Sequence, residues 1–218
     1  MMKRLFCVLL SALSLFLAGC ATTLRSDVTS FQRWPANAAG SSYSFKRVAG
    51  QEASLEHKTY EDLARTELGK LALTEAPQGS KGRFEVSLDY GVQTRTLKSR
   101  EPVWDHPGYW HPAHYHPHRG WHPGYWAPSP YGPTVVGYRT VSQDVSTRRL
   151  RVDISEGTNK VFEASVTSSG ASASLTTIMP YLIRSVFDGF PGTNGQYRIL
   201  EFDMDKGVVT KRALAQPG

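Results

Sequence analysis

The chain has 218 residues and a formal net charge of +6, and 40% of its residues are hydrophobic. These values suit one ordinary domain with a hydrophobic core, or one domain that carries an insertion. The basic excess is spread along the chain, because no run of Lys or Arg is longer than two residues. Nucleic-acid-binding proteins usually concentrate basic residues on one face, so the composition excludes a nucleic-acid partner from the expected functions.

The first residues have the layout of a bacterial secretory signal. Lys3 and Arg4 form a basic start, and the apolar run from Leu5 to Leu17 follows. As a helix this run would span about 20 Å, against roughly 30 Å for a bilayer core, so a signal is favoured over a membrane span. The run ends in Leu-Ala-Gly-Cys20, which resembles the lipobox of bacterial lipoproteins. The alternative is an ordinary secretory signal with an incidental cysteine.

The lipobox predicts a signal peptide over residues 1–19 and a lipid anchor and tether over residues 20–27, with Cys20 carrying the lipid. Its acyl chains, palmitate among them, make the membrane the first expected partner. Ala21 follows the anchor, where an Asp would suggest inner-membrane retention. We therefore expect attachment to the outer membrane, facing the periplasm. Cys7 leaves with the signal, so the mature chain has no thiol for catalysis, zinc or iron–sulfur chemistry.

In the first half of the chain, strands are expected at residues 28–34 and 43–48. A helix is predicted over residues 59–73, because Thr59 followed by Asp62 fits a helix-start box. The residues expected on its apolar face are Tyr60, Leu63, Ala64, Leu68, Leu71 and Ala72, with Glu61 outside that face. A strand is predicted over residues 83–96, because Phe84, Val86, Leu88, Tyr90 and Val92 alternate with polar residues.

In the second half, strands are expected at residues 135–146, 150–154, 161–166 and 197–204. A helix is predicted around Leu175–Phe187, with Pro180 either bending it or opening a new helix. The fold class expected is α+β, a mainly antiparallel sheet with two helices packed on one face. The single domain would cover residues 28–212, and residues 213–218 would form a C-terminal tail.

Residues 104–133 differ from the rest of the chain in being rich in Pro, Gly, His and aromatic residues. The sequence His106-Pro-Gly-Tyr-Trp110 returns as His122-Pro-Gly-Tyr-Trp126. Because proline forbids a regular helix and disfavours a central strand, we predict an irregular loop inserted between two strands.

Six histidines in this segment make it a candidate for zinc, copper or nickel binding, because neutral imidazole suits all three metals. The candidate ligands are His106, His111, His114, His116, His118 and His122. The segment has neither cysteine nor a helical spacing that would fix ligand directions, and histidine-rich tracts are compositional signals. Metal binding is therefore the alternative interpretation.

The aromatic residues of the segment form a candidate contact surface for sugars, partner proteins or lipid headgroups. They are Trp104, Tyr109, Trp110, Trp121, Tyr125 and Trp126. The competing interpretation is a tolerated surface insertion whose rings pack on one another. No phosphate loop, Gly-x-Ser-x-Gly or His-Glu-x-x-His motif occurs, and Glu52, Glu56 and His57 have the spacing of a solvated segment. We therefore expect no catalytic residue and no enzyme activity.

Beyond the lipobox, several segments of the chain resemble bacterial lipoproteins grouped as domain of unknown function 4136. They are residues 27–31 (DVTSF), 55–63 (LEHKTYEDL), 84–90 (FEVSLDY), 179–182 (MPYL) and 187–192 (FDGFPG). The resemblance implies an aromatic, Gly- and Pro-rich insertion in the middle of the domain and implies no activity. We expect an envelope lipoprotein with a non-catalytic binding or scaffolding role toward an envelope protein or the cell wall. The alternative is a periplasmic metal-binding lipoprotein.

Overall fold

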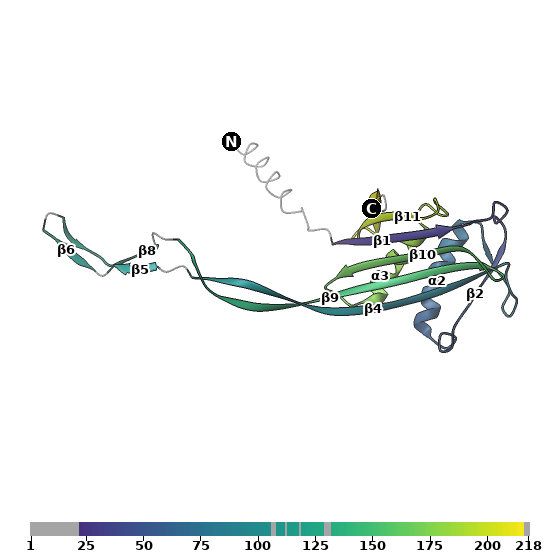
Figure 1. Ribbon diagram of the computed structural model, residues 1–218, viewed down its shortest axis with the longest axis horizontal. Helices are drawn as coiled ribbons and strands as arrows, with labels where there is room; N and C mark the ends of the chain where they lie inside the picture. Colours follow the sequence, from purple (N-terminus) through teal and green to yellow (C-terminus); the bar gives the residue numbers. More distant parts are fainter. Residues whose placement is uncertain (1–21, 106–107, 112, 118, 129–131, 216–218) are drawn as a thin grey trace, which may run out of the picture. The chain divides into compact units, whose positions relative to one another are not determined.

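The computed structural model describes residues 22–105, 108–111, 113–117, 119–128 and 132–215 (Figure 1). The chain divides into two compact units. The first, here called the sheet unit, comprises residues up to Thr94 and from Ser146 onward. The second, here called the ribbon unit, comprises residues 95–145.

The sheet unit is built on one eight-stranded sheet in the order β12-β11-β1-β10-β9-β4-β2-β3 (Figure 1). Its strands are β1 (Thr23–Gln32), β2 (Ser42–Phe45), β3 (Thr74–Glu75), β4 (Phe84–Asp105), β9 (Thr134–Glu156), β10 (Asn159–Gly170), β11 (Gln196–Asp203) and β12 (Val208–Ala215). The two long strands belong to both units, because residues 95–105 of β4 and 134–145 of β9 fall in the ribbon unit. Strand β1 lies antiparallel between β10 and β11, with Val28 opposite both Val166 and Arg198.

The sheet is mixed, so the expected mainly antiparallel α+β fold is wrong: the chain is mostly β. Strand β2 runs parallel to both β3 and β4, with Tyr43 opposite Glu75 and Phe84. The chain leaves β2, passes through a helix and returns as β3, and such a crossover produces parallel neighbours. Gly82 permits the close approach of β2, because a Cβ atom there would collide with the backbone of Tyr43. The strand expected at residues 43–48 is present as β2, whereas β3, with only two residues, shows no periodicity in the sequence and was not predicted.

Two strands differ from the expected segments at the ends of the chain. Strand β1 begins at Thr23, so residues 23–27 are paired with β11 where a tether was expected. Leu24 explains the difference, since its side chain is buried in the core. Strand β12 was not predicted, and it includes residues 213–215 of the expected tail.

Both predicted helices are present, with shifted ends. Helix α2 spans Leu55–Lys70 and begins earlier than predicted, because Ser54 caps it by accepting a hydrogen bond from the His57 amide at 3.1 Å. It ends before residue 73, since Ala72 adopts a positive φ of 59°. Helix α3 spans Leu175–Phe187 and runs through Pro180, which therefore opens no new helix.

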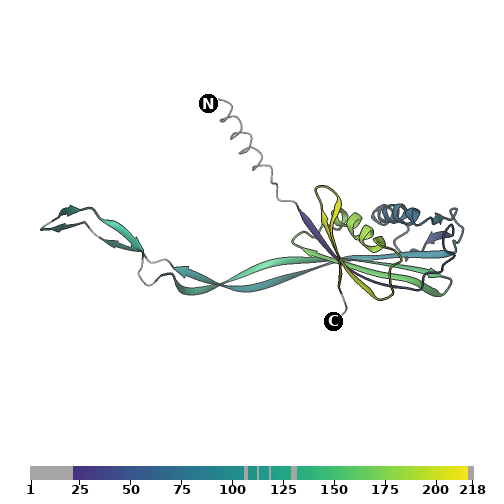
Figure 2. The same cartoon turned by 90° about the horizontal axis from the view of Figure 1, so that it is seen from above.

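Both helices lie on the same face of the sheet, and the hydrophobic core lies between the helices and that face (Figure 2). The predicted alternation along β4 is confirmed for Phe84, Val86 and Leu88, which are buried. Val92 was expected on the same buried face but is 39% exposed. The core face of β4 therefore ends before Val92.

The predicted irregular loop is also wrong, because the ribbon unit contains strands throughout its middle. Strands β5 (Gly108–His111) and β8 (Tyr125–Pro128) form one antiparallel pair, and β6 (His114–His116) and β7 (Gly120–His122) form another. The last residues of the two repeat copies, Trp110 and Trp126, lie opposite each other in the first pair. Proline is tolerated because every strand of a two-stranded sheet is an edge strand.

Candidate functional site

The β6–β7 hairpin sorts its side chains by chemistry. His114 lies opposite His122, Tyr115 opposite Trp121, and His116 opposite Gly120. Because side chains alternate between the faces of a strand, the three histidines share one face, while the two aromatic residues share the other. The hairpin therefore has an imidazole face (His114, His116, His122) and an aromatic face (Tyr115, Trp121).

The three rings of the imidazole face lie close together. The ring centroid of His114 is 4.9 Å from that of His116 and 5.6 Å from that of His122, and the centroids of His116 and His122 are 5.7 Å apart. The rings of His114 and His122 are stacked, with 25° between their planes. In this arrangement the nitrogens do not converge: among the described residues no group of three or more His, Cys, Asp or Glu is placed to hold a metal ion.

The aromatic face is open to solvent. Tyr115 is 61% exposed and Trp121 is 72% exposed, with ring centroids 6.1 Å apart. Trp104, at the end of β4, is 53% exposed. Half or more of the surface of each of these three side chains is therefore available to a partner.

The remaining predicted site residues divide into two groups. Cys20, His106 and His118 lie outside the described residues. Strands β5 and β8 contain the other five, for which only the backbone is described: Tyr109, Trp110, His111, Tyr125 and Trp126.

The ribbon unit has no hydrophobic core of its own among its described residues. None of the side chains described within residues 95–145 is buried. Its strands are held by cross-strand contacts, such as the hydrogen bond from Thr96 to Asp144 at 2.7 Å and the ion pair of Arg139 with Glu101 at 3.1 Å. Exposed pairs of this kind contribute little free energy each. The described side chains of this unit are therefore exposed to solvent and do not form a packed core.

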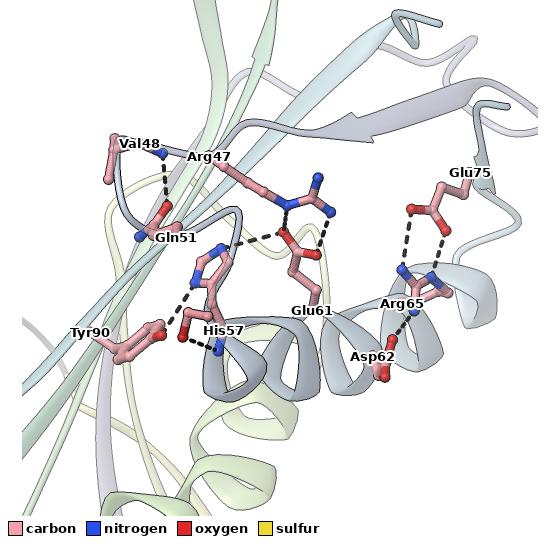
Figure 3. Close-up of polar contacts among 10 residues, drawn as sticks. Arg47, Val48, Gln51, His57, Glu61, Asp62, Arg65, Glu75 and Tyr90 are labelled. Atoms are coloured by element: carbon pink, nitrogen blue, oxygen red, sulfur yellow. Dashed lines mark hydrogen bonds and ion pairs between the residues drawn. The ribbon is translucent and has the colours of Figure 1, made fainter. Parts of the chain in front are cut away.

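The sheet unit contains a buried polar cluster on α2 (Figure 3). His57 and Glu61 lie one helical turn apart with side chains 1% and 2% exposed, and His57 Nε2 is 3.3 Å from Glu61 Oε1. Arg47 donates to both carboxylate oxygens of Glu61, at 2.7 and 2.6 Å. The Nδ1 atom of His57 is 3.2 Å from the hydroxyl of Tyr90 on β4.

This cluster joins α2 to the segment after β2 and to β4. The expected solvated setting of His57 is therefore wrong, and Glu61, placed outside the apolar face of the helix, is also buried. The spacing of His57 and Glu61, four residues apart on a helix, is the sequence signal that could have indicated the pair. With both side chains removed from solvent, the arrangement suits a structural role.

We expect the cluster to make stability depend on pH. Burial lowers the pKa of His57, while the nearby carboxylate of Glu61 opposes that shift in part. In the unfolded chain the imidazole titrates near 6.5. As pH falls below about 6.5, the unfolded chain binds a proton that the folded protein does not, so the free energy of unfolding decreases. Urea unfolding between pH 8 and pH 5 measures this loss.

The matched control for this pH effect is His57→Gln, which removes the titrating ring. We expect the variant to lose less free energy of unfolding than the wild type over the same pH interval. An equal loss in both proteins would show that other groups cause the pH dependence.

Taken together, these features define a mostly β protein with a two-helix layer on one side of a mixed sheet and a second unit of paired edge strands. The chain belongs to the family described as domain of unknown function (DUF4136), whose family model matches residues 27–192. No helix in the described part of the chain is long and apolar enough to cross a membrane. No curated protein matches the chain.

Two solved structures show partial similarity to the chain. One is a PDZ domain protein from Parabacteroides distasonis, with 10% identity and a TM-score of 0.38, covering 88% of this chain. The chain spans only 42% of that protein's length. The other is PelC from Paraburkholderia phytofirmans, solved as a dodecamer, with 14% identity, a TM-score of 0.36, and coverage of 78% of this chain and 99% of PelC.

Proposed function

We propose that this protein is an envelope lipoprotein, anchored through Cys20 to the outer membrane and facing the periplasm, that binds a partner through residues 95–145. The role is binding or scaffolding, without catalysis. The observation that carries this proposal is that no described side chain of the ribbon unit is buried, although many are large and apolar. The lipobox supports the anchor and the location.

The exposed apolar side chains of the ribbon unit explain why a partner is expected. An isolated two-stranded ribbon is at best marginally stable in water, and exposed apolar patches mark interaction sites. The exposed side chains are Leu97, Val103, Trp104, Tyr115, Trp121, Val135, Val136 and Tyr138. Aromatic faces alone would suit a cell-wall sugar, but the aliphatic members favour the apolar surface of an envelope protein.

Site-specific photo-crosslinking tests this binding surface. A photoreactive residue at Tyr138 or Trp121, which are 62% and 72% exposed, should crosslink to an envelope protein in intact cells. The control position is Val48, which is 63% exposed but lies in the sheet unit. Crosslinks to a cell-wall polymer would favour the sugar alternative. Equal crosslinking from all three positions would contradict a dedicated surface.

The anchor has its own test, Cys20→Ser. We expect this variant to remain an unlipidated precursor, because the serine hydroxyl does not replace the thiol that receives the lipid. Two or more acyl chains give stable anchoring, so the wild type should stay with the outer-membrane fraction and the variant should leave it. Metabolic labelling with a palmitate analogue measures the modification. Labelling of the variant at the wild-type level would contradict the lipoprotein proposal.

The imidazole face supports a second candidate function, the binding of zinc, copper or nickel. The specific observation is that the ring centroids of His114, His116 and His122 lie within 5.7 Å of one another on one face of a hairpin. Changes of rotamer in exposed side chains are fast, so the rings can turn from stacking to a shared ion. Three imidazole nitrogens with an open fourth position would then hold the metal.

Titration of the full chain with Zn²⁺ tests the metal candidate. We expect His114→Ala to weaken binding at least about tenfold, and the affinity of the wild type to fall as pH drops through about 6.5, where imidazole becomes protonated. The matched control is Tyr115→Ala, which alters the opposite face of the same strand. Equal weakening by both changes, or a pH-independent affinity, would contradict the proposed ligands.

A further inference from the structure

Arg198 is a buried cation whose hydrogen-bonding groups are only partly used. It lies on β11 with 7% of its surface exposed, on the same face as the core residues Leu200 and Phe202. Its Nη2 atom donates to the carbonyl of Val186, near the end of α3, over a long distance of 3.4 Å. Its Nε and Nη1 atoms have no hydrogen-bond partner among the described residues.

The charge of Arg198 is also poorly compensated. Burial lowers its pKa, and the carboxylate that opposes this shift is that of Asp188. Asp188 is already engaged by Arg212, whose Nε and Nη2 atoms donate to the carboxylate at 3.0–3.1 Å. A buried polar group without partners carries a large desolvation cost, more so when it is charged. The neighbourhood of Arg198 therefore favours an additional negative charge.

A cavity of about 520 Å³ lies beside this side chain. Its walls come from β11, β12 and the turn that follows α3, and Arg198, Ile199, Leu200, Ala213 and Leu214 line it. Gly189 also lines the cavity, and a Cβ atom there would lie 3.3 Å from Arg198 Nη1, which is tighter than an ordinary contact. Because residue 189 has no side chain, its backbone packs closely against the buried Nη1 atom.

We propose that this cavity binds a monocarboxylate with a short apolar tail, with the carboxylate on the guanidinium of Arg198 and the tail along the exposed side chain of Leu214. The volume falls within the range of small-molecule sites, which combine apolar walls with a few placed polar groups. One uncompensated positive charge matches one negative charge, and the Arg212–Asp188 pair adds no net charge at the rim. The site lies in the sheet unit and does not depend on binding by the ribbon unit.

Isothermal titration of the full chain with hexanoate tests the site, with a buffer-matched blank. We expect saturable binding of hexanoate, weaker binding of hexanol, which lacks the charge, and weaker binding of acetate, which lacks the tail. Arg198→Gln should weaken hexanoate binding by about tenfold or more, as expected for loss of a charge-assisted hydrogen bond.

A second pair of variants keeps the test decisive if Arg198→Gln fails to fold. Leu214 is 74% exposed and lines the cavity, whereas Val208 is 46% exposed on the same strand and does not. Leu214→Glu should abolish hexanoate binding by placing a like charge beside it, and Val208→Glu should leave binding unchanged. Equal effects of the two changes, hexanol binding as tight as hexanoate, or no saturable binding by the wild type would each overturn the proposal.

Discussion

Glu61→Ala is expected to lower the free energy of unfolding by about 1.5–3 kcal/mol, because the change removes two charge-assisted hydrogen bonds from Arg47 and leaves the buried ring of His57 without its carboxylate partner. The carboxylate of Glu61 accepts two hydrogen bonds from Arg47 and lies 3.3 Å from the buried ring of His57. Without it, the segment after β2 and helix α2 lose their shared polar contact. Equilibrium unfolding in urea at pH 7.5 measures the change.

The control for Glu61 is its neighbour along the chain, Asp62→Ala. Asp62 also forms an ion pair, with Arg65, but its side chain is 67% exposed. Exposed pairs contribute about 0–1 kcal/mol, so this variant should unfold at nearly the wild-type urea concentration. A loss at Asp62 as large as that at Glu61 would contradict the importance assigned to burial.

Leu88→Ala should cost about 2–5 kcal/mol of unfolding free energy, the range for removing a buried leucine from a packed core. Leu88 is 3% exposed and lies on the core face of β4, beside Val86. The loss includes both the transfer of the side chain from water and the cavity left behind. Thermal and urea unfolding should both report it.

Ser87→Ala is the matched control for Leu88, because residue 87 lies on the opposite face of the same strand, where it is only partly buried. We expect a change of less than about 0.5 kcal/mol, as for substitutions away from packed or bonded positions. Similar losses at residues 87 and 88 would refute the alternation on which the placement of β4 rests.

Local periodicity predicted the strands and helices that are long enough for their apolar residues to recur at a regular spacing. The strand beginning at Phe84 and the helix ending at Phe187 were recognised because their apolar residues recur at the period of a half-buried strand or helix. The parallel pairing of β2 could not be recognised, because β2 has four residues and β3 has two. Which strands pair across such short segments depends on contacts distant in sequence, such as Tyr43 with Phe84.

The middle of the chain was predicted as a loop because proline was weighed against strand formation. That reasoning holds for a central strand, but a two-stranded ribbon has only edges, and Pro128 lies opposite Gly108 within one. The repeat is visible in the sequence, and the antiparallel pairing of the segments that contain its two copies is a feature that was not predicted. Alternation could also have placed Arg198 on the face of Leu200 and Phe202.

On the function proposed above, residues 95–145 bind a partner while the sheet unit folds without them. The most direct test replaces residues 104–133 with a short Gly/Ser turn and measures how much partner, identified by crosslinking, copurifies with the folded chain. We predict that partner binding is lost while urea unfolding stays cooperative, with a midpoint close to that of the wild type. Partner binding retained at the wild-type level, or loss of the cooperative transition, would contradict this division of roles between the two units.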